Sequence, residues 1–223
     1  MGGIPTGYGK ALNSMEIYNP ASDTWIPGEA MPKGRIAHST CVLEEKIYVI
    51  GGEAEEGPKT IFAEVDVYDP IEKFWTSIAP MPSPKDYASA CTFDGKIYVF
   101  GGCDEYPWNG LTTIVVYDPE TDSWEEKASL RTGRWALSTC MLDDMIYCLG
   151  GTPIGISAGI AAVEVYDPVE NKVYPATSMP SIRRAFPSFT YQDEIYAFGG
   201  STSPPPDYAR NSSNTFVGVP VNQ

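Results

Sequence analysis

Four cations recur at one position of a repeated segment, and their chemistry suits the binding of an anion. Aligning the repeats on a recurring serine (Ser39, Ser89, Ser138 and Ser188) places the following cations four residues earlier: Arg35, Lys85, Arg134 and Arg184. Guanidinium and ammonium groups make strong hydrogen bonds to carboxylates. If the fold gathers them around one axis, this cation series predicts a site for a carboxylate-bearing peptide or an anionic small molecule. The alternative is that the cations pack between repeats and pair with nearby carboxylates.

An aromatic segment is the second candidate for binding. Tyr106, Pro107 and Trp108 follow one another in an irregular stretch that begins at Cys103. Exposed aromatic side chains often anchor protein interfaces. We therefore expect Tyr106 and Trp108 to contact a partner protein, unless Trp108 packs against a neighbouring unit.

Residues that would support catalysis or metal binding are sparse. His38 is the single histidine, whereas a copper or iron site needs several imidazoles or a set of His and carboxylate ligands. The sequence has no Gly-x-Ser-x-Gly elbow, no Cys-x-x-Cys pair and no phosphate-binding loop. We therefore predict no enzyme activity, no metal and no cofactor, although acids such as Glu53 and Asp104 could still converge into a carboxylate pair.

A repeat of about fifty residues must position all of these side chains. CVLEEKIYVIGG begins at Cys41, CTFDGKIYVFGG at Cys91, CMLDDMIYCLGG at Cys140, and the shorter TYQDEIYAFGG at Thr190. Two apolar runs around an acidic or Asp-Gly turn predict a β-hairpin. A second strand pair follows, marked by Tyr-Asn-Pro or Tyr-Asp-Pro and then by Trp25, Trp75 or Trp124. Four antiparallel strands in each unit predict a propeller blade.

This set of motifs resembles the Kelch repeat, type 1. The resemblance rests on the double glycine, the Tyr-Asp-Pro turn and the Trp, covers residues 2–200, and weakens in the fourth copy, where Val173-Tyr174 replaces Trp. It implies an all-β Kelch-type β-propeller of four-stranded antiparallel blades, with about four blades' worth of chain. The expected parts are a half unit 1–28, units 33–80, 83–129 and 131–178, a half unit 182–200, and a flexible Ser/Pro-rich tail 201–223.

The two half units allow two arrangements. They complete one another in a closed four-bladed ring, or the chain is a fragment of a larger propeller, for example a six-bladed one. We favour the fragment, because members of the resembled family usually have six or seven blades.

Charge and cysteine usage limit the possible partners. A formal charge of −14 argues against binding to nucleic acid or to anionic membranes. The sequence has no apolar run long enough for a membrane helix and no secretion signal at its start. Four cysteines are expected to be buried free thiols: Cys41, Cys91, Cys140 and Cys148. Cys103 lies in a loop and is expected to be exposed or reactive. We therefore expect a soluble, acidic, cytoplasmic protein.

The leading hypothesis is a non-catalytic protein-interaction module. Strand alternation places the long variable loops on one face of the propeller, and this loop-rich face would bind a partner protein or an acidic peptide. The resemblance adds ubiquitin-ligase adaptors or actin as possible partners, although the sequence lacks BTB and BACK segments. Two alternatives stay open, a sugar-processing enzyme similar to sialic-acid mutarotases and a glycan-binding propeller. An acid within about 5 Å of two cations of the series would favour the enzyme.

Overall fold

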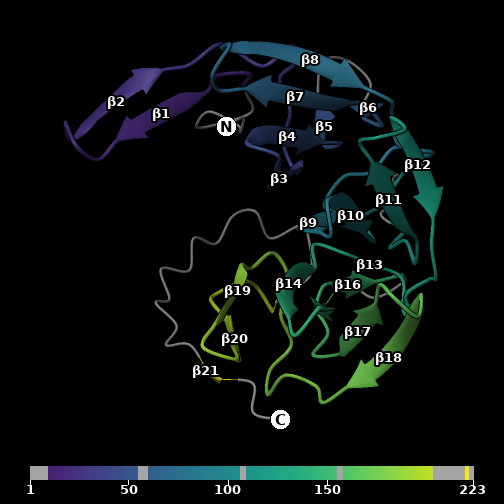
Figure 1. Cartoon of the computed structure of the whole chain (residues 1–223). Helices are drawn as coiled ribbons and strands as arrows, with labels where there is room; N and C mark the ends of the chain where they lie inside the picture. Colours follow the sequence, from purple (N-terminus) through teal and green to yellow (C-terminus); the bar gives the residue numbers. More distant parts are fainter. Residues whose placement is uncertain (1–9, 55–59, 106–108, 155–157, 203–218, 221–223) are drawn as a thin grey trace.

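Three four-stranded antiparallel sheets form the body of the computed structural model, which describes residues 10–54, 60–105, 109–154, 158–202 and 219–220 (Figure 1). The first blade contains β3 (Ser39–Leu43), β4 (Lys46–Ile50), β7 (Val65–Asp69) and β8 (Phe74–Ile78). The second contains β9 (Ser89–Phe93), β10 (Lys96–Phe100), β11 (Ile114–Asp118) and β12 (Ser123–Glu126). The third contains β14 (Ser138–Leu142), β15 (Met145–Leu149), β17 (Val163–Asp167) and β18 (Lys172–Ala176). Neighbours in each sheet follow the chain order, so the predicted all-β fold with propeller blades is confirmed.

Incomplete sheets stand at the two ends of an open arc (Figure 1). The N-terminal hairpin, β1 (Glu16–Asn19) and β2 (Thr24–Pro27), corresponds to the third and fourth strands of a blade, since it carries the Tyr-Asn-Pro turn and Trp25. At the other end, β19 (Ser188–Tyr191) and β20 (Glu194–Ala197) correspond to the first and second strands, and β21 (Val219–Pro220) pairs with β20. The predicted unit boundaries and the flexible tail stay predictions, and most of the tail lies outside the described residues.

Local turn chemistry fixes each hairpin. After β7, a carboxylate oxygen of Asp69 accepts hydrogen bonds from the N–H groups of Ile71 (2.9 Å) and Glu72 (3.0 Å). These hydrogen bonds, the one from Glu72 first, lower the pKa of the Asp69 carboxyl. At the tip between β3 and β4, Glu44 and Glu45 both take positive φ, 48° and 62°, as a two-residue hairpin turn requires.

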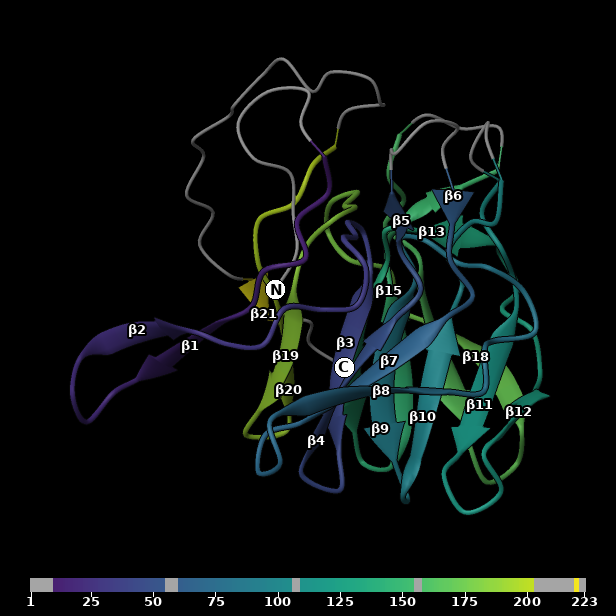
Figure 2. The same cartoon turned by 90° about the horizontal axis from the view of Figure 1, so that it is seen from above.

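The two ends of each blade differ. In Figure 2 the described parts of the connections after β4 and β10 lie at one end, with the short strands β5 (Glu53–Ala54), β6 (Thr60–Ile61) and β13 (Arg134–Trp135). There β5 pairs with β6, and β13 pairs with β16 (Thr152–Pro153). The tight hairpin turns lie at the opposite end. We call these the loop-rich face and the turn face.

The apolar core lies between the blades. Val65 and Val67 of the first blade share a buried cluster with Ile97 and Val99 of the second, and similar clusters join the later blades. Cys140 and Cys148 are buried, Cys41 and Cys91 are half-buried, and all five thiols are free. Every blade therefore depends on its neighbour for burial of its apolar sheet face.

A chain of main-chain hydrogen bonds also links the blades near their innermost strands. The N–H of Tyr87 donates to the carbonyl of Ala37 (2.9 Å). In the same way, the N–H of Ala136 donates to the carbonyl of Tyr87 (2.8 Å), and the N–H of Ala185 donates to the carbonyl of Ala136 (2.8 Å). All four residues have φ near +50°. A positive φ is unusual for residues other than glycine. Its recurrence at all four positions indicates that the hydrogen bonds between blades require this backbone conformation.

Candidate protein-binding face

The cation series lies inside the protein and not on its surface. The exposed fractions of Arg35, Lys85 and Arg134 are 0%, 1% and 0%. The prediction of an accessible positive ring is therefore wrong for these three. Of the alternative, the structure shows the pairing with nearby carboxylates for Arg35 and Arg134. Partner binding by these side chains has no support from the geometry.

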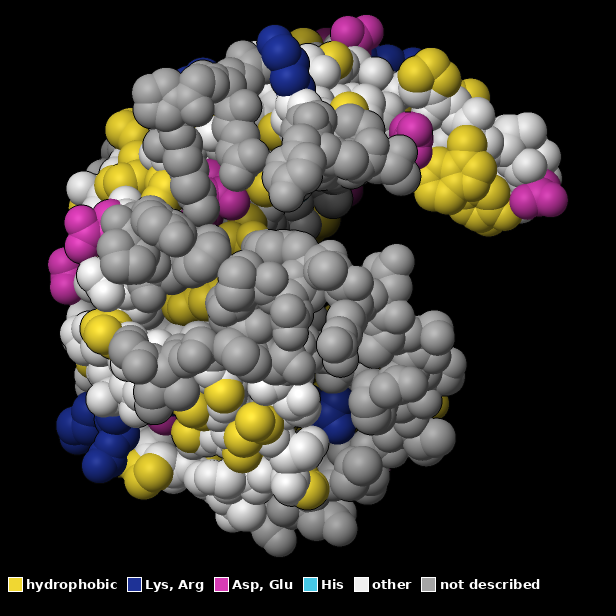
Figure 3. All heavy atoms as spheres, turned by 180° about the vertical axis from the view of Figure 1, so that it is seen from behind, with side chains coloured by type: hydrophobic (Ala, Val, Ile, Leu, Met, Phe, Trp, Pro, Cys, Tyr) yellow, Lys and Arg dark blue, Asp and Glu magenta, His cyan; other side chains and the backbone are white. Residues whose placement is uncertain are grey.

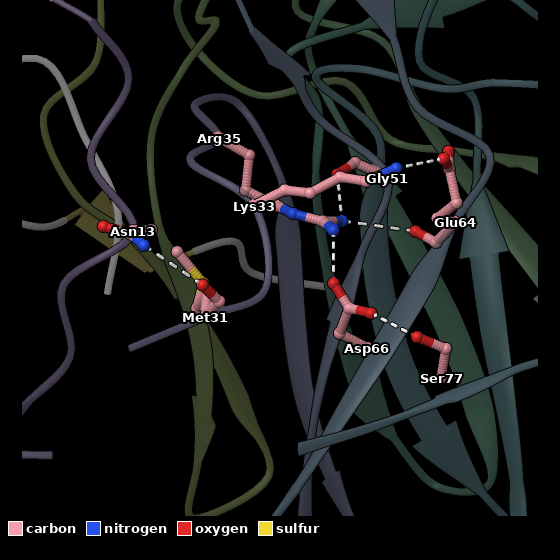
Figure 4. A network of polar contacts seen from close by, with 8 residues as sticks. All are labelled: Asn13, Met31, Lys33, Arg35, Gly51, Glu64, Asp66 and Ser77. Carbon is pink, nitrogen blue, oxygen red and sulfur yellow. Dashed lines mark hydrogen bonds and ion pairs between the residues drawn. The ribbon is translucent and has the colours of Figure 1, made fainter. Parts of the chain in front are cut away.

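Arg35 is held by groups of its own blade through its two terminal nitrogens (Figure 4). Its Nη1 donates to the carbonyls of Gly51 (2.9 Å) and Glu64 (3.2 Å), and its Nη2 forms an ion pair with Asp66. The other carboxylate oxygen of Asp66 accepts the Ser77 hydroxyl at 2.8 Å. Such a pair satisfies a buried charge at a cost in desolvation, so its role is to fix geometry more than to add stability.

Arg134 repeats this arrangement in the third blade, whereas Lys85 departs from it in the second. Arg134 donates to the carbonyls of Gly150 and Ala162 and pairs with Glu164. The residue that corresponds to Glu164 in the second blade is Val115.

Lys85 therefore has no carboxylate at that position. Its Nζ donates to Thr113 Oγ1 (2.5 Å) and to the carbonyl of Gly101 (3.3 Å). Burial away from water lowers the pKa of Lys85 to about 8.

The main chain of the same residues joins consecutive blades. The carbonyl of Lys85 accepts the N–H of Gly52 at 2.8 Å, and the carbonyl of Arg134 accepts that of Gly102 at 3.0 Å. A Cβ added at Gly51 would lie 2.2 Å from the carbonyl oxygen of Lys85. The glycine pairs therefore permit the close approach of the next blade, in addition to ending a strand.

The fourth member of the series is Arg183, and the prediction of Arg184 is wrong by one residue. Arg183 Nη1 donates to the carbonyl of Gly199 at 2.7 Å, and its own carbonyl accepts the N–H of Gly151 at 2.8 Å, as in the other junctions. The fourth hairpin is one residue shorter, so an alignment on Ser188 misplaces the cation. Arg184 is half-buried, with its guanidinium carbon 5.5 Å from the ring centroid of Trp135.

The aromatic candidates Tyr106 and Trp108 lie outside the described residues, so their contact with a partner stays a prediction. Cys103, at the start of that segment, differs from the expectation. It is fully buried, and its thiol donates to the Asp86 carboxylate at 2.5 Å. Buried structural cysteines are inert, so this burial argues against a reactive cysteine.

A groove of about 590 Å³ opens on the loop-rich face between the N-terminal segment and the first blade. Three segments line it, and their residues are Lys10, Ala11 and Asn13; Pro32, Lys33 and Gly34; and Ala54, Thr60 and Phe62. Lys33 is about half exposed, pairs with Glu64 at 2.5 Å, and has its ammonium 5.3 Å from the Phe62 ring centroid. The hydrogen bond from Lys33 lowers the pKa of the Glu64 carboxyl. The groove thus combines an accessible cation with an aromatic wall.

Sequence reasoning missed this groove. Lys33 does not recur, because Ser83 and Thr132 take its place in the following repeats. A search for recurring residues selects those that build the blades, and it passes over a residue present in one unit.

Comparison with known proteins agrees with the repeat architecture. The model of the KLHDC2/KLHL20/DRC7 Kelch-repeats domain matches residues 1–200. The chain belongs to the Kelch-repeat family.

Individual relatives of this Kelch-repeat chain match over single repeats. Human Kelch-like protein 33 is 45% identical over 42 residues, which is 19% of this chain and 8% of the relative. Human Kelch-like protein 15 is 43% identical over 44 residues, 20% of this chain and 7% of the relative. The matched segments thus span less than a tenth of these curated proteins.

A solved structure supports the fold over a longer range. The structure of YjhT superposes with a TM-score of 0.75 at 16% identity, covering 89% of this chain and 68% of that one. This likeness shows a shared fold.

Two features are absent from the described residues. No helix among them is long and apolar enough to cross a membrane. No group of three or more His, Cys, Asp or Glu side chains in the same part of the chain could hold a metal ion.

Proposed function

We propose that this chain is a non-catalytic protein-interaction module that binds an acidic peptide segment of a partner through the groove of the loop-rich face. The observation that carries the proposal is the placement of Lys33 at the groove, beside Phe62 and about half exposed. Family membership supports a protein partner in general terms.

Groove chemistry favours an acidic ligand. Lys10 and Lys33 bring positive charge to an otherwise acidic protein, and an incoming carboxylate can take the place of Glu64 on Lys33. Phe62 lines the groove but is only 8% exposed, so Lys33 is the main group that a ligand would meet there. Rim charges act mainly on specificity and association rate.

A direct test measures binding of fluorescent decapeptides by anisotropy, comparing a pool rich in Asp and Glu with a pool in which these are Asn and Gln. We expect the acidic pool to bind more tightly, and we expect Lys33→Glu to weaken that binding at least tenfold. Added salt should weaken binding by the unaltered protein, because exposed ion pairs are screened.

A matched control is Lys172→Glu. Lys172 is also an exposed lysine in an ion pair, with Glu170 at 3.2 Å, but it lies near a hairpin turn on the turn face. The Lys172→Glu substitution should leave the affinity for the acidic peptides unchanged. Equal affinity of both pools, or equal loss in the two variants, would contradict the proposal.

The described ion pairs give no support to the sugar-processing alternative. Asp66 pairs with Arg35, and Glu164 pairs with Arg134, so each of these acids meets one cation of the series. An acid close to two of these cations was the arrangement expected of that enzyme.

A further inference from the structure

The N-terminal hairpin carries an apolar face that no described residue covers. The exposed fractions of Trp25 and Ile26 are 67% and 53%, and Ile17 and Tyr18 are also exposed. In Figure 3 hydrophobic side chains gather on this projecting arm. Tyr18 and Trp25 nevertheless pack as the matching pair of a whole blade does, with ring centroids 5.1 Å apart, the same value as for Tyr68 and Trp75. The hairpin is therefore formed as part of a blade, and the described residues provide no preceding blade beside it.

Whole blades show what such a face contacts. The indole N–H of Trp124 donates to the carbonyl of Ala79 in the preceding blade (2.8 Å), and Asp122 accepts the N–H of the same Ala79 (3.0 Å). Trp75 likewise donates to the carbonyl of Glu29 at 2.9 Å. In the second blade, an acid and a Trp two residues later thus bind the N–H and the carbonyl of one residue in the preceding blade.

The N-terminal hairpin has the same two groups at the same spacing, Asp23 and Trp25. Among the described residues the Trp25 indole has no hydrogen-bond partner, and Asp23 accepts the Tyr18 hydroxyl at 2.8 Å. Counting repeats onward from Glu29 and Ala79 leads to Thr177, just after β18. Thr177 is exposed, and in the described part of the chain neither its N–H nor its carbonyl has a partner.

Charge gives a second, independent match. In the first and third blades the buried arginine pairs with an acid two residues before the tyrosine that recurs in every repeat, as Glu164 precedes Tyr166. The described residues offer no such acid to Arg183, because its sheet has no third strand of this kind. Two residues before Tyr18 stands Glu16, which is exposed.

Strand pairing adds a third match. Ile47, Ile97 and Ile146 lie opposite Tyr68, Tyr117 and Tyr166 in the three whole blades. The same register would place Ile195 of β20 opposite Tyr18 of β1. At present β21 pairs with Tyr196 and Ala197 on this edge, so it would have to be displaced.

We infer that the N-terminal hairpin of one copy completes the fourth blade of a second copy, with Glu16 on Arg183 and with Asp23 and Trp25 on Thr177. The occupant is a second copy because the hairpin is held beside the first blade of its own chain by Trp75, at the opposite end of the arc from β20 (Figure 1). Two reciprocal junctions would close a ring of eight blades, three whole ones from each copy and two shared, which is within the usual range of about 4–8.

Charge exchange between two variants tests this directly by light scattering. The unaltered chain should have twice its mass of 24.3 kDa, whereas Glu16→Arg alone and Arg183→Glu alone should each be monomers. Mixing the two variants should restore the dimer, because one junction then has the exchanged pair and the other has the native pair. Glu72→Arg, at an exposed turn, should remain dimeric.

Cross-linking keeps the test decisive if a charge variant folds poorly. Asp23→Cys in one tagged chain and Thr177→Cys in a chain with a different tag should form a disulfide that joins both tags, whereas Val169→Cys in place of Thr177→Cys should not. A monomeric unaltered chain, or a cross-link that forms only within one chain carrying both cysteines, would overturn the inference.

Discussion

A methyl group added at Gly101 would lie 2.3 Å from the carbonyl oxygen of Arg134 in the next blade. The same glycine accepts the Lys85 ammonium on its own carbonyl, and Gly102 donates its N–H to Arg134. One glycine pair therefore serves the buried cation of its own blade and the main chain of the following one. The junction between blades depends on these contacts.

Substitution of Gly101 should lower the free energy of unfolding more than substitution of Gly199, because only Gly101 is approached closely by the next blade. Gly101 and Gly199 have nearly equal φ, 59° and 60°, but nothing lies within 4 Å of a Cβ built at Gly199. Gly199→Ala should cost about 1–2 kcal/mol from backbone strain. Gly101→Ala should cost roughly a further 1–3 kcal/mol from displacement of the next blade.

Urea unfolding measures the difference between these two variants. Both should be made in the Glu16→Arg background, so that association between copies does not cover Gly199. Equal losses in the two variants would show that the approach of Arg134 is not what requires glycine.

Removal of one member of a buried ion pair should be severe, whereas replacement of both should be mild. Arg134→Ala leaves Glu164 charged and buried without its partner, and we expect a loss of roughly 3–5 kcal/mol in the free energy of unfolding. Arg134→Lys with Ala162→Thr and Glu164→Val copies the Lys85, Thr113 and Val115 arrangement of the second blade, so it should cost much less. Thermal and urea unfolding of the three proteins would check the order, and a triple variant as unstable as Arg134→Ala would refute it.

Lys85 should make stability depend on pH in alkaline solution. Its pKa is about 8 in the folded protein and 10.5 for an ordinary lysine. Between these values the unfolded chain binds a proton that the folded chain has released, so the contribution of Lys85 to the free energy of unfolding rises with pH. Below pH 8 the cost of burying the charge is fully present.

Comparison with Lys85→Met isolates this contribution from other groups that titrate in the same range. The stability of the variant relative to the unaltered protein should fall by roughly 3 kcal/mol as the pH rises from 8 to 10.5. Chemical unfolding at several pH values provides the measurement. A constant difference across this range would mean that Lys85 keeps its ordinary pKa.

The fold was predictable because each blade contains the same local signals. The acidic turn at Glu44-Glu45, the double glycine at Gly51 and the Tyr-Asp-Pro turn at Tyr68 each specify a strand end through backbone chemistry alone. Because these signals recur, the repeats can be aligned with one another, and the alignment shows which strands are equivalent in each blade.

The candidate site was predicted only in part, because burial depends on residues that do not recur. The acids that cover the cation series, Asp66 and Glu164, follow their arginines by about thirty residues, and Val115 replaces them in the second blade. The shift from Arg184 to Arg183 arose from a hairpin one residue shorter, which moves a serine relative to the glycines. Cys103 was misjudged because an isolated strand bridge to Asp86 gives little signal in sequence.

The chain of links from Ala37 to Ala185 runs in one direction, since each later blade donates to the earlier one. Each link joins immediate neighbours only, as in other linear arrays of repeats. In the monomeric Glu16→Arg variant, amide protons at the two ends of the arc should therefore exchange with solvent first, and protection should increase towards the second blade. Fraying of this kind would release one blade at a time and leave the remaining arc folded.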